Sequence, residues 1–218
     1  MGDASPSWET VANEVQWGED YRPRAVTITH LEMVEAPQGW PAVPPAGVRI
    51  ERVKHVTPEL VRWLYSVVGG PYRWYERLGW DRESWASELA EQGSEVWLVS
   101  VDGTPAGYCQ LASEVVSDAG ADKYSTEVEI LYFGLMQWAH GRGLGRIFLE
   151  QMIHQAWKLS ERHALPQVSR VWVHTCDLDA PAALVNYQAR GMEICKVEEH
   201  SEIVLKHPLS SWEAMFES

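Results

Sequence analysis

Cysteine, basic residues and long apolar runs are all scarce in this sequence. The three cysteines, Cys109, Cys176 and Cys195, are far apart and odd in number, which argues against a disulfide framework or a zinc knuckle and favours packing as small buried side chains. No window approaches the ~18 consecutive apolar residues of a membrane helix. The polar, acidic start lacks the basic-then-apolar order of a signal peptide. We therefore expect a cytoplasmic protein with no membrane partner.

Lysine and arginine number 18 against 31 aspartates and glutamates, which gives a formal net charge of -13. This balance argues against a nucleic-acid partner and would attract a cationic substrate such as an amine. Residues 140–170 depart from it, because five arginines and lysines stand there against two acidic residues. That stretch indicates a docked anion, and a solvated helix face of mixed charge explains it equally well.

With 45% hydrophobic and 22% charged residues, the chain can bury the core of one α/β domain. Alternation and turn signals predict strands near residues 26–31, 48–53, 96–101, 106–112, 127–135, 169–175, 192–199 and 201–206. Capping and periodicity predict helices near residues 57–69, 81–92, 144–163 and 180–189. Residues 1–24 are expected to form a loose arm. The order of elements implies a mixed sheet flanked by helices.

The turn His140-Gly141-Arg142-Gly143-Leu144-Gly145 lies between an apolar strand and the longest predicted helix. Three alternating glycines leave the backbone bare, so that successive N–H groups and the helix N-terminus can face one anion, such as a pyrophosphate. A nucleoside-triphosphate loop would need Gly-Lys-Ser or Gly-Lys-Thr where Gly145-Arg146-Ile147 stands. A dinucleotide fingerprint would need a glycine in place of Arg146 or Phe148. The turn alone predicts an anion site.

Three blocks together resemble the Gcn5-related N-acetyltransferase (GNAT) superfamily: residues 129–135, the turn at 140–145 and residues 178–192. The turn fits the family pattern of Gln or Arg, two residues, Gly, one residue, then Gly or Ala, except that His140 replaces the first residue. Met192 replaces the phenylalanine that usually follows the last glycine. The resemblance covers residues 100–205 well and residues 48–100 loosely.

The resemblance implies an α/β (α+β) fold, with a mixed, mostly antiparallel central sheet flanked by helices and splayed strands that form a CoA groove. We expect an N-terminal arm with an early strand at residues 1–47, the acetyltransferase domain at 48–207 and a tail at 208–218. Dimers are frequent in the superfamily, so a homodimer remains open.

Acetyl-CoA is the co-substrate that the resemblance implies. In the family, the strand before the turn hydrogen-bonds the pantetheine arm, and Gly134 also suits a β-bulge there. The turn would cradle the pyrophosphate, and Arg142 and Arg146 would add charge-assisted contacts. The expected cofactor-binding residues are Phe133, Gly134, Leu135, His140, Gly141, Arg142, Gly143, Leu144, Gly145, Arg146, Asp179 and Asn186.

Acyl transfer to an amine needs a group that accepts a proton and a leaving thiolate that is protonated or stabilised. Glu129 lies where glutamate-using members of the superfamily place a general base, and a half-exposed strand carboxylate is the equal alternative. Glu127 lies on the same strand face and is the second candidate. Tyr187 matches the family's tyrosine that can donate a proton to the departing thiolate, and a role in packing alone is the alternative. Glu129 and Tyr187 are therefore the predicted catalytic residues.

Two histidines have other interpretations. Imidazole titrates near neutrality, which makes a histidine a candidate base, but the position of His140 at the mouth of the turn favours contact with the anion. His174 lies close to Cys176 and two aspartates, but no second His/Cys pair is within sequence reach, so no metal is expected.

Acceptor specificity is expected from the aromatic segment between the first two helices. Tyr72, Arg73 and Trp74 are the predicted substrate-binding residues, because aromatic faces bind a cationic amine or an apolar ring and arginine can hold a carboxylate. Packing of these rings onto the sheet is the alternative. The leading interpretation is an enzyme that acetylates a primary amine of a small molecule or peptide. A CoA-binding sensor or interaction module without catalysis, and a fold member whose groove is filled by side chains, are the alternatives.

Overall fold

The computed structural model describes residues 20–117 and 124–217. They form one seven-stranded sheet in the order β2-β3-β4-β5-β6-β1-β7. The strands are β1 (Tyr21–Met33), β2 (Val48–Arg52), β3 (Glu95–Val101), β4 (Thr104–Ser117), β5 (Tyr124–Leu135), β6 (Val168–Cys176) and β7 (Glu193–Leu205). All neighbouring strands are antiparallel except β5 and β6, so the predicted mixed, mostly antiparallel sheet is confirmed.

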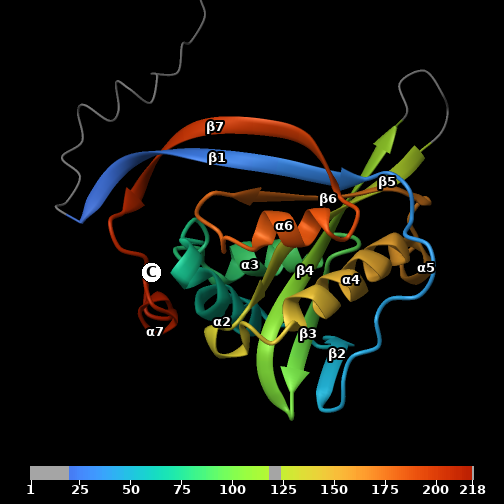
Figure 1. The fold of residues 1–218 in the computed structure, drawn as a ribbon, viewed down its shortest axis with the longest axis horizontal. Helices are drawn as coiled ribbons and strands as arrows, with labels where there is room; N and C mark the ends of the chain where they lie inside the picture. Colours follow the sequence, from blue (N-terminus) through green and yellow to red (C-terminus); the bar gives the residue numbers. More distant parts are fainter. Residues whose placement is uncertain (1–19, 118–123, 218) are drawn as a thin grey trace, which may run out of the picture.

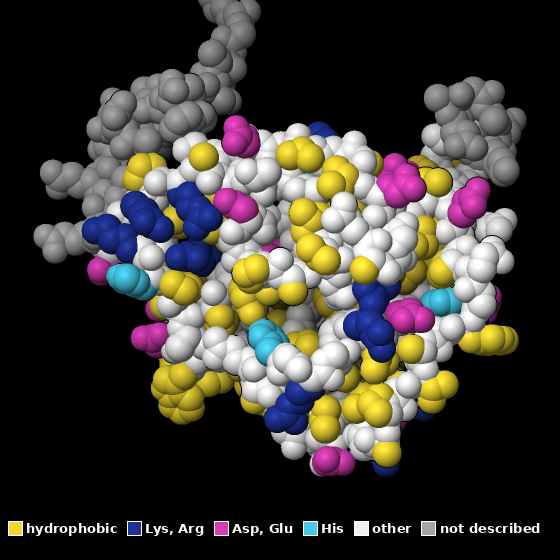
Figure 2. Space-filling model, viewed as in Figure 1, with side chains coloured by type: hydrophobic (Ala, Val, Ile, Leu, Met, Phe, Trp, Pro, Cys, Tyr) yellow, Lys and Arg dark blue, Asp and Glu magenta, His cyan; other side chains and the backbone are white. Residues whose placement is uncertain are grey.

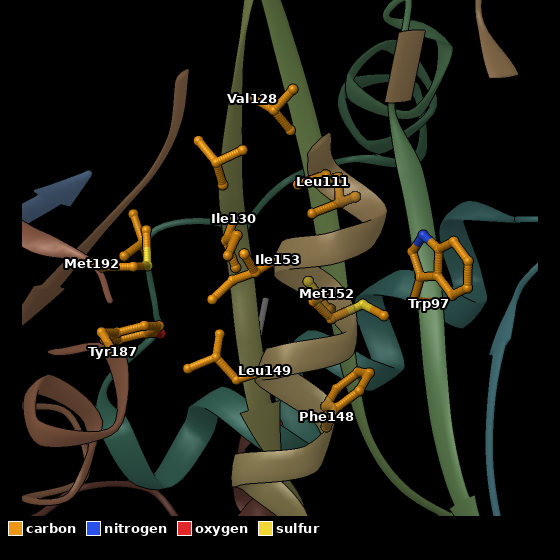
Figure 3. Close-up of a cluster of buried hydrophobic side chains, with 14 of the residues drawn as sticks. Trp97, Leu111, Val128, Ile130, Phe148, Leu149, Met152, Ile153, Tyr187 and Met192 are labelled. Atoms are coloured by element: carbon orange, nitrogen blue, oxygen red, sulfur yellow. The ribbon is translucent and has the colours of Figure 1, made fainter. Parts of the chain in front are cut away.

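Helices cover both faces of the sheet, with α4 and α6 on the near side in Figure 1 and α2 and α3 on the far side. The helical elements are α2 (Pro58–Gly69), η1 (Gly70–Tyr72), α3 (Arg82–Ala90), η2 (Gln137–Ala139), α4 (Leu144–Trp157), α5 (Leu159–Arg162), α6 (Ala183–Gln188) and α7 (Ser211–Ala214). Figure 3 shows Leu149 and Ile153 of α4 packed against Ile130 of β5 in the larger of two apolar cores. No helix in the described part of the chain is long and apolar enough to cross a membrane.

The predicted helix starts at Thr57 and Asp81 are confirmed by their caps. The Thr57 hydroxyl accepts a hydrogen bond from the Leu60 N–H at 3.3 Å, and Asp81 Oδ1 accepts one from the Ser84 N–H at 2.8 Å. Pro58 occupies the first turn of α2, where its missing N–H costs nothing.

The predicted helix over residues 144–163 ends earlier than expected. Helix α4 stops at Trp157, and Lys158 separates it from the short α5. Arg162 stabilises the break, because its guanidinium donates to the carbonyls of Gln155 and Lys158 at the end of α4.

The prediction of two final strands, at 192–199 and 201–206, is wrong. The structure has one strand, β7, paired with β1 from Tyr21↔Leu205 to Glu32↔Glu193. Residues 199–201 contain no glycine or proline, and they continue the ladder opposite residues 25–27. Strand β1 fills the place between β6 and β7 and begins within the expected arm; residues 1–19 of that arm lie outside the described residues.

The chain after β7 also packs on the domain. A Cβ atom at Gly70 would lie 2.5 Å from Cβ of Ala214 in α7, so only glycine allows this approach. Arg62 of α2 donates to the carbonyls of Met215 and Glu217. Residues 208–217 therefore brace α2 next to the aromatic segment that follows it.

Candidate active site

Strands β5 and β6 pair only over their first halves, from Thr126↔Val168 to Glu129↔Trp172. Beyond that point they diverge, since β5 continues along β4 while β6 continues along β1 (Figure 1). The edge of β5 that faces β6 therefore has no strand partner from residue 130 to 135 in the described part of the chain. Such an edge offers free backbone donors and acceptors to an extended ligand.

A cavity of about 1160 Å³ occupies the opening between the diverging strands. Its walls come from β5, β6 and α6, from the turn after η2 and from the aromatic segment after η1. The middle of β1 and the last residues of β7 complete them. Figure 2 shows a hollow near the middle of the face seen in Figure 1, with hydrophobic side chains around it. Its volume lies slightly above the usual range of ligand pockets, about 300–1,000 Å³.

The expected β-bulge lies at Leu131 and not at Gly134. Along β4 the pairing passes from Gln110↔Tyr132 to Leu111↔Ile130, which leaves Leu131 as the extra residue. Gly134 has a different role, because a Cβ there would collide with Val68 of α2. The glycine lets α2 lie close to the strand at the floor of the cavity.

Two glycines of the turn have backbone angles that favour glycine. Gly141 and Gly143 have φ of 74° and 72°, in the left-handed region, and a Cβ at either would meet no atom within 4 Å. Gly145 has an ordinary φ, and its Cβ would lie 3.5 Å from Cδ1 of Leu135. Gly141, Gly145 and Arg146 line the cavity, so the bare start of α4 opens onto it.

Arg142 and Leu144 of the turn do not line the cavity, whereas His140 does. Leu144 is buried in the core beneath α4, and the guanidinium of Arg142 lies over the Trp138 ring at 5.4 Å. His140 lines the cavity, where its Nε2 is 3.0 Å from the Leu135 carbonyl oxygen and its ring stacks on Tyr72. His140 thus closes the turn onto the end of β5.

The basic stretch at 140–170 divides between two tasks. Lys158 lies over the Trp40 ring, and Arg162 forms an ion pair with Glu95. Arg170 forms ion pairs with the carboxylates of Glu32 and Glu127. Two other arginines line the cavity: Arg146 at the start of α4 and Arg190 just after α6. Nε of Arg190 is buried without a hydrogen-bond partner among the described residues. Sequence reasoning missed Arg190, although it follows Tyr187 by about one helical turn.

Asp179 and Asn186 both line the cavity, but they hold protein groups. The Asp179 carboxylate accepts hydrogen bonds from the Thr175 hydroxyl at 2.6 Å, the Cys176 N–H at 3.1 Å and the Trp74 indole N–H at 3.3 Å. It therefore fixes the loop after β6 to the aromatic segment. The Asn186 amide donates to the Gly145 carbonyl at 3.5 Å, which ties α6 to the start of α4.

Glu129 forms a carboxylate–imidazole pair at the apex of the opening. Its Oε1 lies 2.9 Å from Nδ1 of His174, and this hydrogen bond raises the pKa of the His174 imidazole above its usual value. Glu127 instead forms an ion pair with Arg170 at 2.7 Å. The second candidate for the base is thus already neutralised by a cation, whereas Glu129 faces a titratable ring.

Tyr187 lies on the cavity wall with its ring almost fully buried. Figure 3 shows it beside Met192 at the margin of the core, and its ring meets Phe133 edge-on with centroids 6.3 Å apart. Burial and the nearby Asp179 carboxylate raise the pKa of Tyr187 well above its usual value. The hydroxyl is therefore protonated throughout the neutral range.

Tyr72, Arg73 and Trp74 all line the cavity. The Arg73 guanidinium donates to the carbonyls of Leu205 and Lys206, so it holds the end of β7. Trp74 packs against neighbouring aromatic rings and donates to Asp179, as described above. The segment is both a packing element and a cavity wall, and the two interpretations of its rings are compatible.

Several wall residues were not predicted from the sequence. Residues 202–204 of β7 and Ile28 of β1 line the cavity because β1 is inserted beside β6. His174 was considered only as a metal ligand; no group of three or more His, Cys, Asp or Glu side chains within residues 20–117 and 124–217 is placed to hold a metal ion. Side-chain alternation in β6 could have shown that His174 lies on the same face of the sheet as Trp172, which pairs with Glu129.

Comparison with known proteins agrees with this geometry. Residues 59–191, more than half of the chain, match the acetyltransferase (GNAT) family. No match was found among curated proteins.

Solved structures with a similar fold include three that differ in how much of each chain aligns. A Drosophila protein has a TM-score of 0.52 at 11% identity and covers 89% of this chain and 54% of its own. A GCN5-related N-acetyltransferase from Sphaerobacter thermophilus has a TM-score of 0.48 at 18% identity, over 95% of this chain and 60% of its own. An aminoglycoside acetyltransferase from an uncultured soil metagenomic sample has a TM-score of 0.49 at 14% identity, and the alignment covers 66% of this chain and 88% of its own. At these identities the likeness concerns the fold alone, and the chain spans little more than half the length of the first and second of these proteins.

Proposed function

Because this chain belongs to the acetyltransferase (GNAT) family, we propose that it transfers the acetyl group of acetyl-CoA to a primary amine of a small molecule or a peptide. The main observation in support of the proposal is that β5 and β6 diverge after the pair Glu129↔Trp172. It creates one continuous cavity that runs from the bare start of α4 to the Glu129–His174 pair. An anion site and a proton acceptor thereby share one opening.

The donor half of the cavity suits an extended thioester with a pyrophosphate. The edge of β5 at residues 133–135, which has no strand partner and whose Leu135 carbonyl contacts His140, can hydrogen-bond the amides of a pantetheine arm as an added strand would. Open space above Gly141 and Gly143, together with the helix N-terminus, suits a pyrophosphate. Arg146 and Arg190 bring positive charge to the same wall. Bound acetyl-CoA would supply the activated acetyl group.

The acceptor half suits a positively charged amine. Glu76, Asp179 and Glu202 line this side together with the aromatic segment. Burial, and to a lesser extent the nearby Glu76 carboxylate, raises the pKa of Glu202, as expected for an acid that lies near another negative charge. An ammonium group would be attracted here and would then meet the Glu129–His174 pair, which can take its proton.

Tyr187 completes the proposed chemistry at the leaving group. Its buried hydroxyl remains protonated at neutral pH and can donate to the sulfur as the thioester breaks. The raised pKa makes it a weak acid, so we expect it to act first as a hydrogen-bond donor to the thiolate. Glu129 and Tyr187 thus serve opposite ends of the transfer, at nitrogen and at sulfur.

Calorimetry with acetyl-CoA, followed by thiol release with a panel of primary amines, tests this proposal. Binding together with release that depends on one amine supports it. Binding without release from any amine would identify a CoA-binding module and overturn the transferase proposal. Absence of binding would overturn the donor site itself.

Substitutions at Gly145 locate the pyrophosphate. Gly145 has an ordinary φ and lines the cavity, so alanine and valine can be introduced there without the backbone strain expected at Gly143. We expect the affinity for acetyl-CoA to fall from Gly145→Ala to Gly145→Val while the unfolding temperature changes little. Unchanged affinity in Gly145→Val would show that the pyrophosphate lies elsewhere.

A further inference from the structure

The cavity wall exposes the histidine of the Glu129–His174 pair and not the carboxylate. His174 lines the cavity, and 45% of its side chain is accessible, whereas Glu129 lies behind it with 15% accessible. The strands explain this order. Glu129 belongs to the last paired position of β5 and β6, and His174 is two residues further along β6, where the strands have parted. An amine that enters the cavity would meet His174 before it meets Glu129.

The hydrogen bond fixes which nitrogen of His174 carries a proton. An ionised carboxylate only accepts hydrogen bonds, so Nδ1, which lies 2.9 Å from Glu129 Oε1, must be the donor. Neutral His174 therefore carries its lone pair on Nε2. Among the described residues, no hydrogen bond engages that nitrogen. A nearby carboxylate that holds one ring nitrogen and leaves the other free is the arrangement of an oriented general base.

We propose that His174, held by Glu129, is the group that removes the proton from the acceptor amine, and that Glu129 is its positioning carboxylate. This inference rests on the proposed function and reassigns the base within the pair. Two geometric observations support it: the His174 side chain lines the cavity, and Glu129 contacts Nδ1 of the ring and not Nε2.

The proposed step balances as follows. An ammonium acceptor loses one proton to Nε2 of His174, which passes it to solvent at its accessible edge. The nitrogen lone pair forms the C–N bond at the acetyl carbon and gives up a second proton, and the C–S bond breaks with its electron pair on sulfur. Tyr187 hydrogen-bonds the thiolate. Nε2 of His174, neutral again once the first proton has left, accepts this second proton and passes it to solvent, and the thiolate takes up one proton from solvent. Of the two protons lost by nitrogen, one is thereby balanced by the new S–H bond and the other remains in solvent.

The charged and titratable groups around His174 come from four directions. Glu129 reaches it from β5, His30 from β1 with ring centroids 5.9 Å apart, Asp179 from the loop after β6, and Glu76 from the segment between η1 and α3. The carboxylates favour the imidazolium, and the bond to Glu129 is the largest cause of the raised pKa of His174. Because the base must be neutral, activity is expected to rise with pH through this raised pKa.

A second histidine–carboxylate pair on the same sheet face is a natural control. Nε2 of His30 lies 2.9 Å from Glu198 Oε2, the same distance as in the Glu129–His174 pair, but His30 does not line the cavity. A purely structural role for such pairs would make the two histidines equivalent. A role in proton removal would single out His174.

His174→Asn is the decisive variant, because an Asn side chain still offers an N–H to Glu129 but has no basic nitrogen. We expect kcat to fall about 10²–10⁴-fold, while acetyl-CoA affinity and the unfolding temperature stay near those of the unmodified protein. His30→Asn should leave kcat unchanged. His174→Gly should regain part of its turnover when free imidazole is added, which a structural role would not produce.

Glu129→Gln separates the two assignments of the base. If His174 is the base, the acid limb of the kcat profile persists in Glu129→Gln and moves to lower pH, because the carboxylate no longer raises the imidazole pKa. Retention of full activity in His174→Asn, or loss of the acid limb in Glu129→Gln, would overturn the inference and return the base to Glu129. Absence of thiol release from the unmodified protein would instead refute the proposed function.

The tautomer can be measured without turnover. Nitrogen-15 NMR of histidine-labelled full-length protein should show His174 protonated at Nδ1 and unprotonated at Nε2 above its pKa. Glu129→Gln should weaken that preference. An Nε2-protonated ring in the unmodified protein would contradict the proposed base.

Discussion

Glu95 and Glu129 are two largely buried glutamates of the same sheet that have opposite surroundings. Glu95 on β3 is 2% accessible and accepts from Arg52 at 2.6 Å, from Arg162 at 2.9 and 2.8 Å, and from His163 at 2.9 Å. Glu129 on β5 has one partner, the His174 imidazole. The first carboxylate joins β2, β3 and α5, and the second stands where two strands separate.

The difference shows how partner number decides what a buried carboxylate can do. Two permanent cations hold Glu95 ionised and lower its pKa to about 2, so it does not exchange protons in the neutral range. The single partner of Glu129 is a titratable imidazole, whose pKa the bond to Glu129 raises, so the pair can gain or lose a proton at the ring. The Glu95 cluster therefore stabilises the fold, and the Glu129–His174 pair is available for chemistry.

Glu95→Gln tests the structural half of the comparison and should have the largest effect. A neutral amide leaves the Arg52, Arg162 and His163 side chains around a site that no longer carries charge, so we expect the free energy of unfolding to fall by about 3–5 kcal/mol. Urea denaturation measures the loss. The exposed neighbour Glu161 is the matched control, and Glu161→Gln should change stability by less than about 0.5 kcal/mol.

At a temperature where Glu95→Gln is folded, its kcat should equal that of the unmodified protein. A loss below about 1 kcal/mol would show that the arginines find other partners and that the cluster is not a stabilising centre.

Acid should weaken the Glu95 cluster in the unmodified protein. The pKa of Glu95 falls from 4.5 to about 2 on folding, so its contribution is fully present above pH 4.5 and is lost as the pH falls from 4.5 through about 2. At about 1.36 kcal/mol per unit, that contribution is about 3 kcal/mol. Urea midpoints measured across this range should decline more steeply for the unmodified protein than for Glu95→Gln. Parallel declines would assign the acid sensitivity to other groups.

Glu129→Gln tests the chemical half. We expect kcat to fall about 10²-fold, because the amide holds the His174 ring less firmly and no longer stabilises its protonated form. Stability should change by less than about 1 kcal/mol, since the amide oxygen can still accept from Nδ1–H. Thiol-release kinetics and urea denaturation measure the two quantities.

Glu127→Gln is the control for that variant. Glu127 lies on the same face of β5 as Glu129 but forms an ion pair with Arg170 of β6, so its substitution should leave kcat unchanged. If Glu129→Gln lost more stability than activity, the two buried glutamates would be alike and the comparison would fail.

Local chemistry made most of the fold predictable from the sequence. Capping residues at Thr57 and Asp81, and the Asp102-Gly103 turn with φ of 49° and 82°, are signals within a few residues of each other. The place of β1 in the sheet was not predictable in this way. It depends on pairing between residues 21–32 and 193–205, which are far apart in the sequence and carry no turn signal of their own.

The candidate site divides in the same way. The backbone of the glycine turn follows from Gly141 and Gly143, whose positive φ needs no distant contact to be expected. The pairing of Glu129 with His174 depends on the divergence of β5 and β6, which neither strand reveals alone. Likewise, nothing near Glu95 in the sequence indicates that Arg162 and His163 will reach it from α5 and the residue after it.

Substitutions of Arg52 and Arg162 test which of the two cations contributes more to the stability of the Glu95 cluster. The Arg52 side chain is 40% accessible and makes one hydrogen bond to Oε1, whereas Arg162 is 21% accessible and engages both oxygens. A half-exposed single contact is screened by water, so Arg52→Met should cost about 1 kcal/mol or less in urea denaturation. Arg162→Met should cost about 3 kcal/mol, because it removes the two-pronged partner of a buried charge. Equal losses from both variants would mean that the number of cations around Glu95, and not their geometry, separates it from Glu129.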